Sequence, residues 1–310
     1  MSAGAAPMVS VVTPTYNRVD LLTRTIRSVL AQEFTDFEYI IVDDASTDGT
    51  ESVVESFARS DPRIRYFRLP KNSGHCAAPK NHGVRHALGK YVAFVDSDDL
   101  WLPEKLSFQI AHMERHPQVA LSHCNAYVIR GKSEEPQALY WKKPPHGENE
   151  KVYRKMLRTC HVIQPSAVVR KECLDEAEPF KEEDDPRYAF AEDWLMWIKI
   201  ARKHRFSYLD RPMVLFREHP DRITGSRKRT AQGDYYLYER YWKDMGLSLL
   251  GRRAALSRTG YYVAKIIYFE EDRFPGKELR ECLHLNPFNL KVYAFLVRAG
   301  FLELARRIRG

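Results

Sequence analysis

Residues 91–99 read Tyr-Val-Ala-Phe-Val-Asp-Ser-Asp-Asp, a compact apolar run that ends in an acidic cluster. An apolar run of this length predicts a strand buried on both faces, as in a parallel sheet covered by helices. Ligands bind outside the carboxyl ends of the strands in open α/β sheets. The stretch therefore predicts an α/β fold with a polar site at one edge of its sheet.

The same pattern occurs upstream. Residues 9–13 form an apolar run before Pro14, and residues 39–42 form another that ends at Asp43 and Asp44. Apolar residues at helical spacing follow each run. Further predicted elements are a strand at 64–67, helices at 84–88, 103–116 and 191–204, one or two strands at 119–129 and a loop at 131–150. The rhythm predicts a Rossmann-like, mostly parallel central sheet flanked by helices.

Beyond residue 225 the pattern is mostly helical, with interruptions at residues 273–276 and 286–287. We therefore predict an α/β domain over residues 1–225 and a basic, mainly helical C-terminal region over residues 226–310.

Composition excludes several classes of protein. Of 310 residues, 44% are hydrophobic, enough to bury a core, and charges interrupt every apolar run before it reaches the length of a membrane span. Residues 1–8 lack the basic start of a signal peptide, and five scattered cysteines favour reduced thiols over disulfides or a zinc site. The expected location is the cytoplasm, and the alternative within it is a peripheral position at the inner face of the cell membrane.

Positive charge is concentrated near the C-terminus. The net charge is +8, and residues 201–310 hold 23 basic against 12 acidic side chains. Such a surface attracts nucleic acid, an anionic membrane or a phosphorylated substrate, or simply faces solvent. Residues 290–308 mix apolar and arginine side chains, which predicts either docking onto the catalytic domain or peripheral membrane contact. No nucleic-acid-binding module is recognised, so we expect no nucleic-acid partner.

The acidic cluster suggests a metal site. Asp96, Asp98 and Asp99 repel one another unless a cation or hydrogen-bond donors offset their charge, and Mg²⁺ or Mn²⁺ bridges such carboxylates to phosphates. The alternative is a polar turn that caps the following helix. Asp43 and Asp44 are suited to hydrogen bonds from a nucleobase or ribose, or to an Asx turn. The glycine-rich dinucleotide and Walker A motifs are absent.

Four motifs in order carry a resemblance. They are Val9-Ser-Val-Val-Thr-Pro-Thr-Tyr-Asn17, Ile41-Val-Asp-Asp-Ala-Ser-Thr-Asp-Gly-Thr50, Phe94-Val-Asp-Ser-Asp-Asp99 and Glu192-Asp-Trp194. Together they resemble glycosyltransferase family 2 over about residues 8–222. The resemblance implies a GT-A fold, a nucleotide-diphospho-sugar donor, a divalent cation and single-displacement transfer with inversion at the anomeric carbon.

The resemblance also implies roles for single residues around the donor nucleotide. Pro14 and Tyr16 belong to the first of the four motifs, which binds the donor nucleotide. Tyr16 resembles the aromatic ring that stacks on the base. Asp44 resembles the carboxylate bonded to a uracil-type imide, with Asp43 beside it. Lys80 falls where the family often has arginine, and is either a donor contact or structural.

Further roles concern the diphosphate and its metal, Mn²⁺ or Mg²⁺. Asp98 resembles the residue at the donor ribose or metal, Asp99 the direct metal ligand, and Asp96 a supporting carboxylate. His219, in Phe216-Arg-Glu-His-Pro220, resembles the histidine of a segment that follows the base-bearing helix, where it either ligates the metal or contacts the diphosphate. The segment itself resembles a lid.

Asp193 resembles the general base that takes the acceptor proton. Glu192 is its acidic neighbour, and Trp194 either packs into the core or stacks on an acceptor sugar. The alternative for both carboxylates is that they only complement a helix N-terminus.

The leading hypothesis is a metal-dependent inverting glycosyltransferase that moves a sugar, from a UDP-sugar donor, to a saccharide or lipid-linked glycan acceptor in cell-surface polysaccharide synthesis. The alternative of another class is a non-catalytic nucleotide- or saccharide-binding module on the same fold. A pyrophosphorylase is disfavoured because its glycine-rich N-terminal loop is missing.

Overall fold

The computed structural model describes residues 6–182, 191–219, 226–271 and 273–309, with side chains described up to residue 299. The chain divides into two compact units, Met1–Arg222 and Ile223–Gly310.

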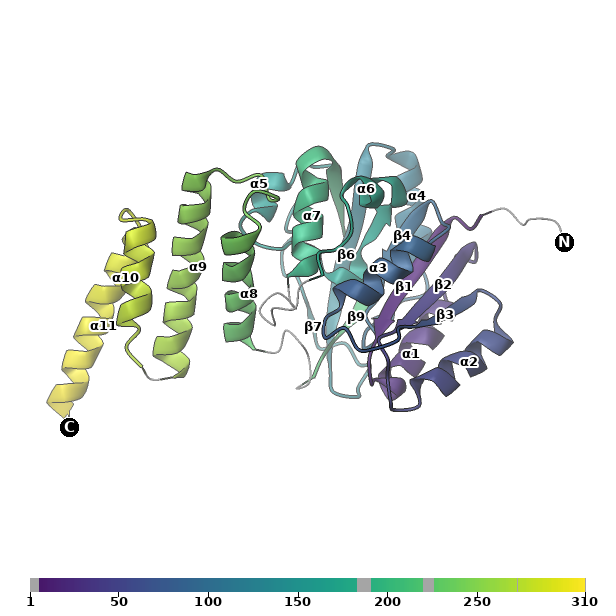
Figure 1. Ribbon diagram of the computed structural model, residues 1–310, viewed down its shortest axis with the longest axis horizontal. Helices are drawn as coiled ribbons and strands as arrows, with labels where there is room; N and C mark the ends of the chain where they lie inside the picture. The colour runs from purple at the N-terminus through teal and green to yellow at the C-terminus, as the bar shows by residue number, and fades with distance from the viewer. Residues whose placement is uncertain (1–5, 183–190, 220–225, 272, 310) are drawn as a thin grey trace. The chain divides into compact units, whose positions relative to one another are not determined.

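One mixed sheet forms the centre of the first unit (Figure 1). Within the described residues its strands are β1 (Val9–Thr15), β2 (Phe37–Asp43), β3 (Ile64–Arg68), β4 (Tyr91–Phe94), β5 (Leu100–Trp101), β6 (Val119–Arg130), β7 (Ala138–Leu139), β8 (Val168–Arg170) and β9 (Arg205–Glu218). Their order is β3-β2-β1-β4-β8-β6-β9-β5, with β7 added to β6.

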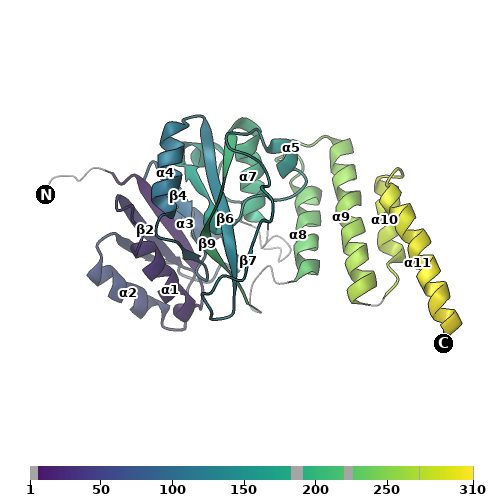
Figure 2. The same ribbon diagram turned by 180° about the vertical axis from the view of Figure 1, so that it is seen from behind.

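Helices flank this sheet (Figures 1 and 2). They are α1 (Val19–Leu30), α2 (Thr50–Ser60), α3 (Ala77–His86), α4 (Lys105–Arg115), α5 (Tyr153–Met156), α6 (Lys171–Glu176) and α7 (Glu192–Lys203), with a 3₁₀ turn at Gln164–Ser166. In α1, residues Leu22, Ile26 and Val29 recur at helical spacing and are fully buried, which confirms the periodicity seen in the sequence.

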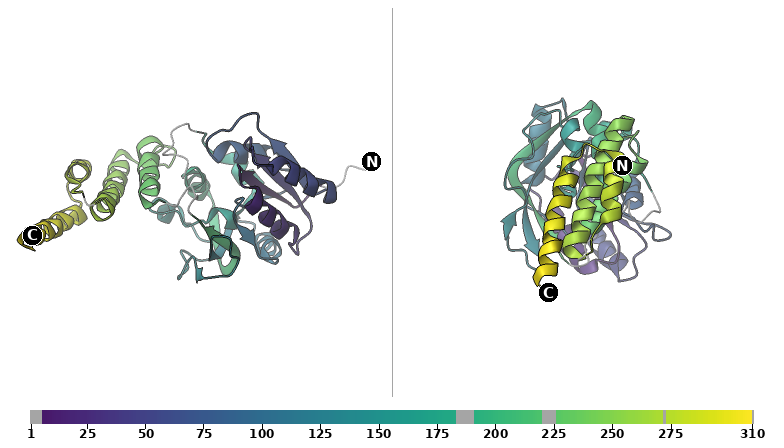
Figure 3. Two further views of the ribbon diagram at one scale, coloured as in Figure 1. Left: turned by 90° about the horizontal axis from the view of Figure 1, so that it is seen from below. Right: turned by 90° about the vertical axis from the view of Figure 1, so that its left-hand side faces the viewer.

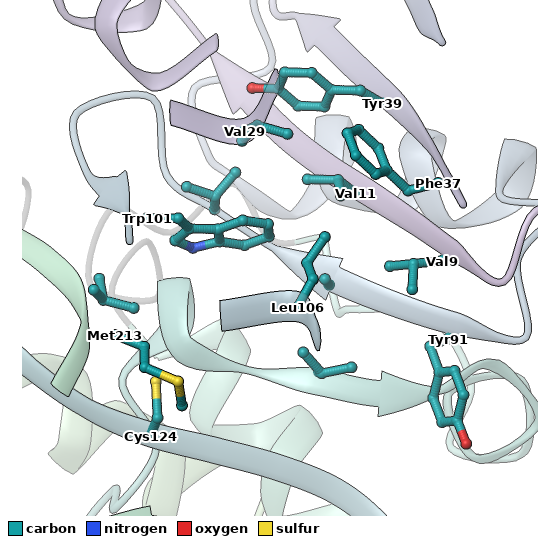
Figure 4. Close-up of a cluster of buried hydrophobic side chains, with 14 of the residues drawn as sticks. Val9, Val11, Val29, Phe37, Tyr39, Tyr91, Trp101, Leu106, Cys124 and Met213 are labelled. Carbon is teal, nitrogen blue, oxygen red and sulfur yellow. The ribbon is translucent and has the colours of Figure 1, made fainter. Parts of the chain in front are cut away.

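The N-terminal half has the predicted parallel pairing, because β1 pairs in parallel with both β2 and β4, and β2 with β3. Strands β1, β2 and β4 are buried along their whole length, as is typical of parallel strands covered on both faces. Figure 4 shows the core on one side of this sheet, where Val9, Val11 and Tyr39 pack with Trp101 and Leu106.

The second half of the sheet is mixed. β8 runs antiparallel to β4 and β6, whereas β6 and β9 are parallel to each other. The sequence did not predict β9, because Asp210-Arg-Pro212 interrupts its apolar pattern. Pro212 is accommodated at a register shift opposite Asn125, where the ladder does not need a proline N–H.

The predicted helix at 84–88 was misplaced, since α3 ends at His86 and Gly89 does not cap it. Gly89 instead passes close to β1: a Cβ there would lie 2.6 Å from the Ser10 backbone nitrogen. Glycine is needed at this position for close packing of two backbone segments.

The second unit is helical, as predicted. It contains α8 (Arg227–Arg240), α9 (Leu249–Glu270), α10 (Gly276–Leu285) and α11 (Leu290–Arg309). Ser226 and Ser248 cap the first two of these helices through their hydroxyl oxygens. Figure 3 shows the helices packed in chain order, and α9, α10 and α11 share a small apolar core. Among the helices that the structure describes, none has the length and apolar composition that crossing a bilayer requires.

Candidate functional site

The acidic cluster forms a tight turn directly after β4. The Asp99 N–H donates to the Asp96 carbonyl (3.2 Å), while the Thr25 hydroxyl of α1 donates to the Asp99 carbonyl (2.9 Å). Asp99 is 2% exposed, and its Oδ1 accepts the backbone N–H of Arg217 on β9 at 2.7 Å. The Arg217 N–H thus offsets part of the repulsion between the carboxylates, while Thr25 fixes the backbone of the turn.

Asp98 lies in a cluster with two side chains from distant segments. Arg18 Nη1, Asp98 Oδ2 and His219 Nε2 lie within 2.9 Å of one another. All three are largely buried, with Asp98 15% exposed. The structure therefore brings His219 to the acidic turn, the neighbourhood that the family resemblance implied for it. Arg18 was missed, because a single arginine before a helix carries no distinctive pattern.

Arg217 holds this part of the site together and was likewise not assigned that role from the sequence. Its side chain is 1% exposed, and its guanidinium donates to the carbonyls of Asp98, Gly131 and Ser133 at 2.6–2.9 Å. Burial lowers the pKa of Arg217, opposed by the charge of Asp99. Arg217 is therefore a structural cation. Of the lid-like segment Phe216–Pro220, residues 216–218 belong to strand β9 rather than to a loop, and Pro220 lies outside the described residues.

The donor types at this turn suit a divalent cation. Two carboxylates and an imidazole are ligands that Mn²⁺ accepts, and Mg²⁺ accepts the carboxylates. Among the described residues, no three His, Cys, Asp or Glu side chains are arranged to hold a metal by themselves. Such an ion is commonly held by one or two carboxylates together with substrate phosphates. The guanidinium of Arg18 already places one positive charge on Asp98.

The nucleotide side of the site lies at the ends of β1 and β2. Tyr16 follows β1 and is 45% exposed, so its ring is accessible. Asp44 follows β2 and accepts hydrogen bonds from the backbone N–H and the hydroxyl of Ser73 at 2.9–3.0 Å. Burial raises the pKa of Asp44 more than these bonds lower it. Asn17 links the two loops, because its Oδ1 accepts the Thr47 N–H at 2.7 Å.

Asp43 and Pro14 have different surroundings from those two residues. Asp43 is fully buried, and its carboxylate accepts from the Ser46 N–H (2.9 Å) and the Tyr66 hydroxyl (2.8 Å). This is the Asx-turn alternative from the sequence. Pro14 is buried inside β1, opposite Val42. Both residues shape the loops that carry Tyr16 and Asp44.

Lys80 forms a buried ion pair. Its Nζ lies 2.8 Å from Glu192 Oε1, and the two residues are 3% and 6% exposed. Glu192 raises the pKa of Lys80 well above its usual range, against the effect of burial. Lys80 on α3 therefore neutralises the first acidic residue of α7, a contact between residues 112 positions apart in the sequence.

Asp193 is the second residue of α7 and is partly buried. Its Oδ1 accepts the Trp194 N–H at 2.6 Å. Burial and the adjacent charge of Glu192 raise the pKa of Asp193 to about 7, while Lys80 opposes the shift. Asp96 contributes in the same direction as Glu192, so α7 and the acidic turn interact electrostatically. A carboxylate with a pKa near neutrality is suited to accept and release a proton.

Trp194 does not present its ring to an acceptor. It is 4% exposed, and its indole N–H donates to the Met156 carbonyl of α5 at 2.7 Å. The core alternative from the sequence therefore describes this residue.

Fold and site together define a GT-A type of enzyme architecture, and the comparisons agree. A sequence model described as "Glycosyl transferase family 2" matches residues 10–177. This chain belongs to glycosyltransferase family 2.

Named relatives include an uncharacterized glycosyltransferase of Rickettsia felis, 34% identical over 205 residues, which cover 66% of this chain and 32% of the relative. The putative colanic acid biosynthesis glycosyl transferase WcaA of Escherichia coli K12 is 28% identical over 72% of this chain and 85% of its own. The Escherichia coli UDP-Glc:alpha-D-GlcNAc-diphosphoundecaprenol beta-1,3-glucosyltransferase WfgD is 28% identical over 66% of this chain and 73% of its own. The chain thus spans about a third of the Rickettsia relative.

Solved structures share the fold. Staphylococcus aureus TarS 1–349 in complex with UDP-GlcNAc matches with a TM-score of 0.64 and 23% identity, over 89% of this chain and 81% of that one. The Pyrobaculum calidifontis mannosyltransferase PcManGT, in complex with GDP-Man and Mn²⁺, matches with a TM-score of 0.61 and 20% identity, over 96% and 81%. At these identities the likeness confirms the GT-A fold.

Proposed function

We propose that this chain transfers a sugar, with inversion, from a nucleotide-diphospho-sugar to a hydroxyl of a saccharide or lipid-linked glycan acceptor in cell-surface polysaccharide synthesis. The observation that carries the proposal is the electrostatic influence on Asp193 of Asp96, the first residue of the acidic turn that follows β4. Asp193 accepts a proton in this proposal, and the acidic turn faces the donor diphosphate.

Asp193 acts as the general base. It takes the proton of the acceptor hydroxyl while that oxygen forms a bond to the anomeric carbon. The bond between the anomeric carbon and the diphosphate oxygen breaks on the opposite face, and the nucleoside diphosphate leaves with the electron pair. The N-terminus of α7, which favours negative charge, stabilises ionised Asp193 against the effect of burial.

Asp98, Asp99 and His219 would hold the divalent ion together with the donor diphosphate. The bound ion supplies positive charge that offsets the charge developing on the leaving diphosphate. Arg18 lies at the same carboxylate and adds a second positive charge facing the diphosphate.

Tyr16 and Asp44 bind the base. The accessible ring stacks on it, and the carboxylate, positioned by Ser73, accepts a hydrogen bond from a uracil-type imide. The TarS complex with UDP-GlcNAc and the name of WfgD support a UDP-sugar donor. WfgD's name also supports a lipid-linked acceptor, and WcaA's name supports cell-surface polysaccharide synthesis.

Calorimetric titration tests the donor site. The chain is titrated with UDP, GDP and dTDP, each with Mn²⁺ and with excess chelator. We expect Mn²⁺-dependent binding that is tightest for UDP. Tightest binding of GDP, the nucleoside diphosphate portion of the GDP-Man in the PcManGT complex, would redirect the donor assignment. Binding without any transfer to saccharide or lipid-linked acceptors would favour a non-catalytic module.

A further inference from the structure

We propose that one end of the second unit is a docking surface for an anionic lipid bilayer. The apolar end is formed by the first turn of α9 and by the α10–α11 connection, with Leu249, Leu250, Phe288 and Leu290 as its large side chains. The inference rests on the proposed function in one respect: a lipid-linked acceptor places the reaction at a membrane.

The large side chains of the apolar end project into solvent. Phe288 is 85% exposed, Leu250 79%, Leu290 77% and Leu249 57%. Single exposed apolar residues are ordinary, but four large ones that are each more than half exposed at one end of a small helical unit mark an interaction site.

The fold brings the two segments of the apolar end together. Arg253 of α9 donates from Nε to the Leu285 carbonyl (3.1 Å) and from Nη2 to the His284 carbonyl (2.8 Å). Asn289 Nδ2 donates to Ser257 Oγ at 2.9 Å. These bonds hold the C-terminus of α10 and the start of α11 against the N-terminal half of α9, and Figures 1 and 2 show the two segments at the same end of the helices.

The two segments that form the apolar end carry charge of one sign, although Glu239, Asp244 and Glu281 belong to the adjoining segments. Residues 245–269 and 282–302 contain no Asp or Glu. The same two segments contain the basic residues Arg252, Arg253, Arg258, Lys265, Lys291 and Arg298. Basic groups beside an anionic bilayer each strengthen binding by about fivefold, while apolar side chains enter the boundary between headgroups and acyl chains.

The combination distinguishes a bilayer from other partners. Nucleic acid pairs with basic side chains but does not need protruding leucines. A second copy of the same surface would bring like charges together.

The inner face of α11 is not available for this role. Val292, Phe295 and Ala299 are buried in the apolar core of the second unit. The part of the predicted amphipathic surface over residues 290–299 therefore packs within the unit on this face, and membrane contact is assigned to the apolar end instead.

Cosedimentation of the full chain with lipid vesicles tests the proposal. The vesicles contain phosphatidylcholine alone or with phosphatidylglycerol. We expect binding to the anionic vesicles that weakens as salt rises. The double variant Leu250→Ser/Phe288→Ser should lose binding by about tenfold or more, because both lost side chains are apolar anchors.

The control is Leu88→Ser, which removes a side chain that is 62% exposed in the first unit and should leave binding unchanged. Because all three changed residues are exposed, the variants should keep the melting temperature of the parent. Equal vesicle binding by the double variant, or no binding by the parent chain, would overturn the proposal. Oligonucleotide retention or dimerisation that the double variant abolishes would assign the apolar end to that partner instead.

Titration of the same proteins with UDP and Mn²⁺, without vesicles, separates this inference from the proposed function. Retained UDP binding with absent vesicle binding refutes only the docking surface. Vesicle binding without UDP binding refutes the proposed donor site and leaves the surface standing.

Discussion

Replacement of Lys80 by methionine should change the pH dependence of transfer without weakening donor binding. Lys80 is buried, and its Nζ lies 2.8 Å from Glu192 Oε1. Methionine fills a similar volume but removes the positive charge that faces the two acidic residues at the start of α7. The resemblance places Lys80 at a donor-contact position. In the structure its charge instead pairs with Glu192, the residue before the proposed base Asp193.

The magnitude follows from Coulomb interaction inside the protein. Two unit charges separated by several ångströms interact by about 1–3 kcal/mol at an effective dielectric constant near 20. Lys80 lowers the pKa of Asp193, and Glu192 raises it. Loss of the lysine charge should therefore move the midpoint of the pH–rate profile upward, from about 7 in the parent, by about one pH unit or more.

The sign can be checked from the role of the base. Asp193 accepts a proton only when ionised, so kcat rises with pH through its pKa. In Lys80→Met a higher pH is needed to ionise the same fraction of Asp193. The assay is the initial rate of sugar transfer between pH 5 and pH 9, together with UDP titration, whose Kd should stay within about twofold because Lys80 is paired away from solvent.

Matched variants complete the test. Lys80→Met alone should lower the free energy of unfolding by about 3–5 kcal/mol, because it leaves Glu192 buried without its ion pair. Lys80→Met/Glu192→Gln should recover most of that stability and return the midpoint toward neutral pH, and Lys80→Arg should stay near the parent. A large loss of UDP affinity in Lys80→Met with an unchanged pH midpoint would refute this reasoning and restore Lys80 as a donor contact.

Three further predictions concern the same site. Asp193→Asn should abolish transfer and spare UDP binding. Because the pKa of Asp193 is raised in the folded state, the parent chain should lose stability as pH rises from about 4 to about 7. The melting temperature of the variant should therefore exceed that of the parent by a margin that grows over this window and is constant above it. A margin independent of pH would contradict the raised pKa. Arg18→Ala should tighten binding of Mn²⁺ alone, measured by electron paramagnetic resonance, because the guanidinium no longer competes for Asp98. Weaker Mn²⁺ binding would instead show that Arg18 supports the site. Arg217→Met should lower the free energy of unfolding by about 3 kcal/mol in a denaturant titration, because three carbonyls lose a buried donor. A loss below about 1 kcal/mol would contradict its structural role.

Local pattern was sufficient where structure depends on neighbours in the chain. The apolar runs at β1, β2 and β4 predicted buried parallel strands, and the periodicity of α1, α4 and α7 predicted helices within a few residues of their bounds. The acidic turn after β4 was visible because strand ends and acidic residues coincide in the sequence. These features were predictable because period and local charge act over a few residues.

Long-range pairing was not visible in the same way. β9 was missed because Pro212 breaks its apolar pattern. The strand can continue through this proline because its pairing with β6 shifts register there. The position of His219 beside Asp98 is set by β9, which carries the chain back to the acidic turn from 121 residues away. No local signal announces such a contact.

The sequence by itself determined the α/β class of the first unit, the helical character of the second, and which acidic residues gather at the strand ends. Only the tertiary structure decided what each charge faces. Lys80 pairs with Glu192, Arg217 with backbone carbonyls and Arg18 with Asp98. The physical reason is that burial and Coulomb interaction depend on distance in space, so the role of a charged side chain is set by residues that the fold, rather than the chain, places beside it.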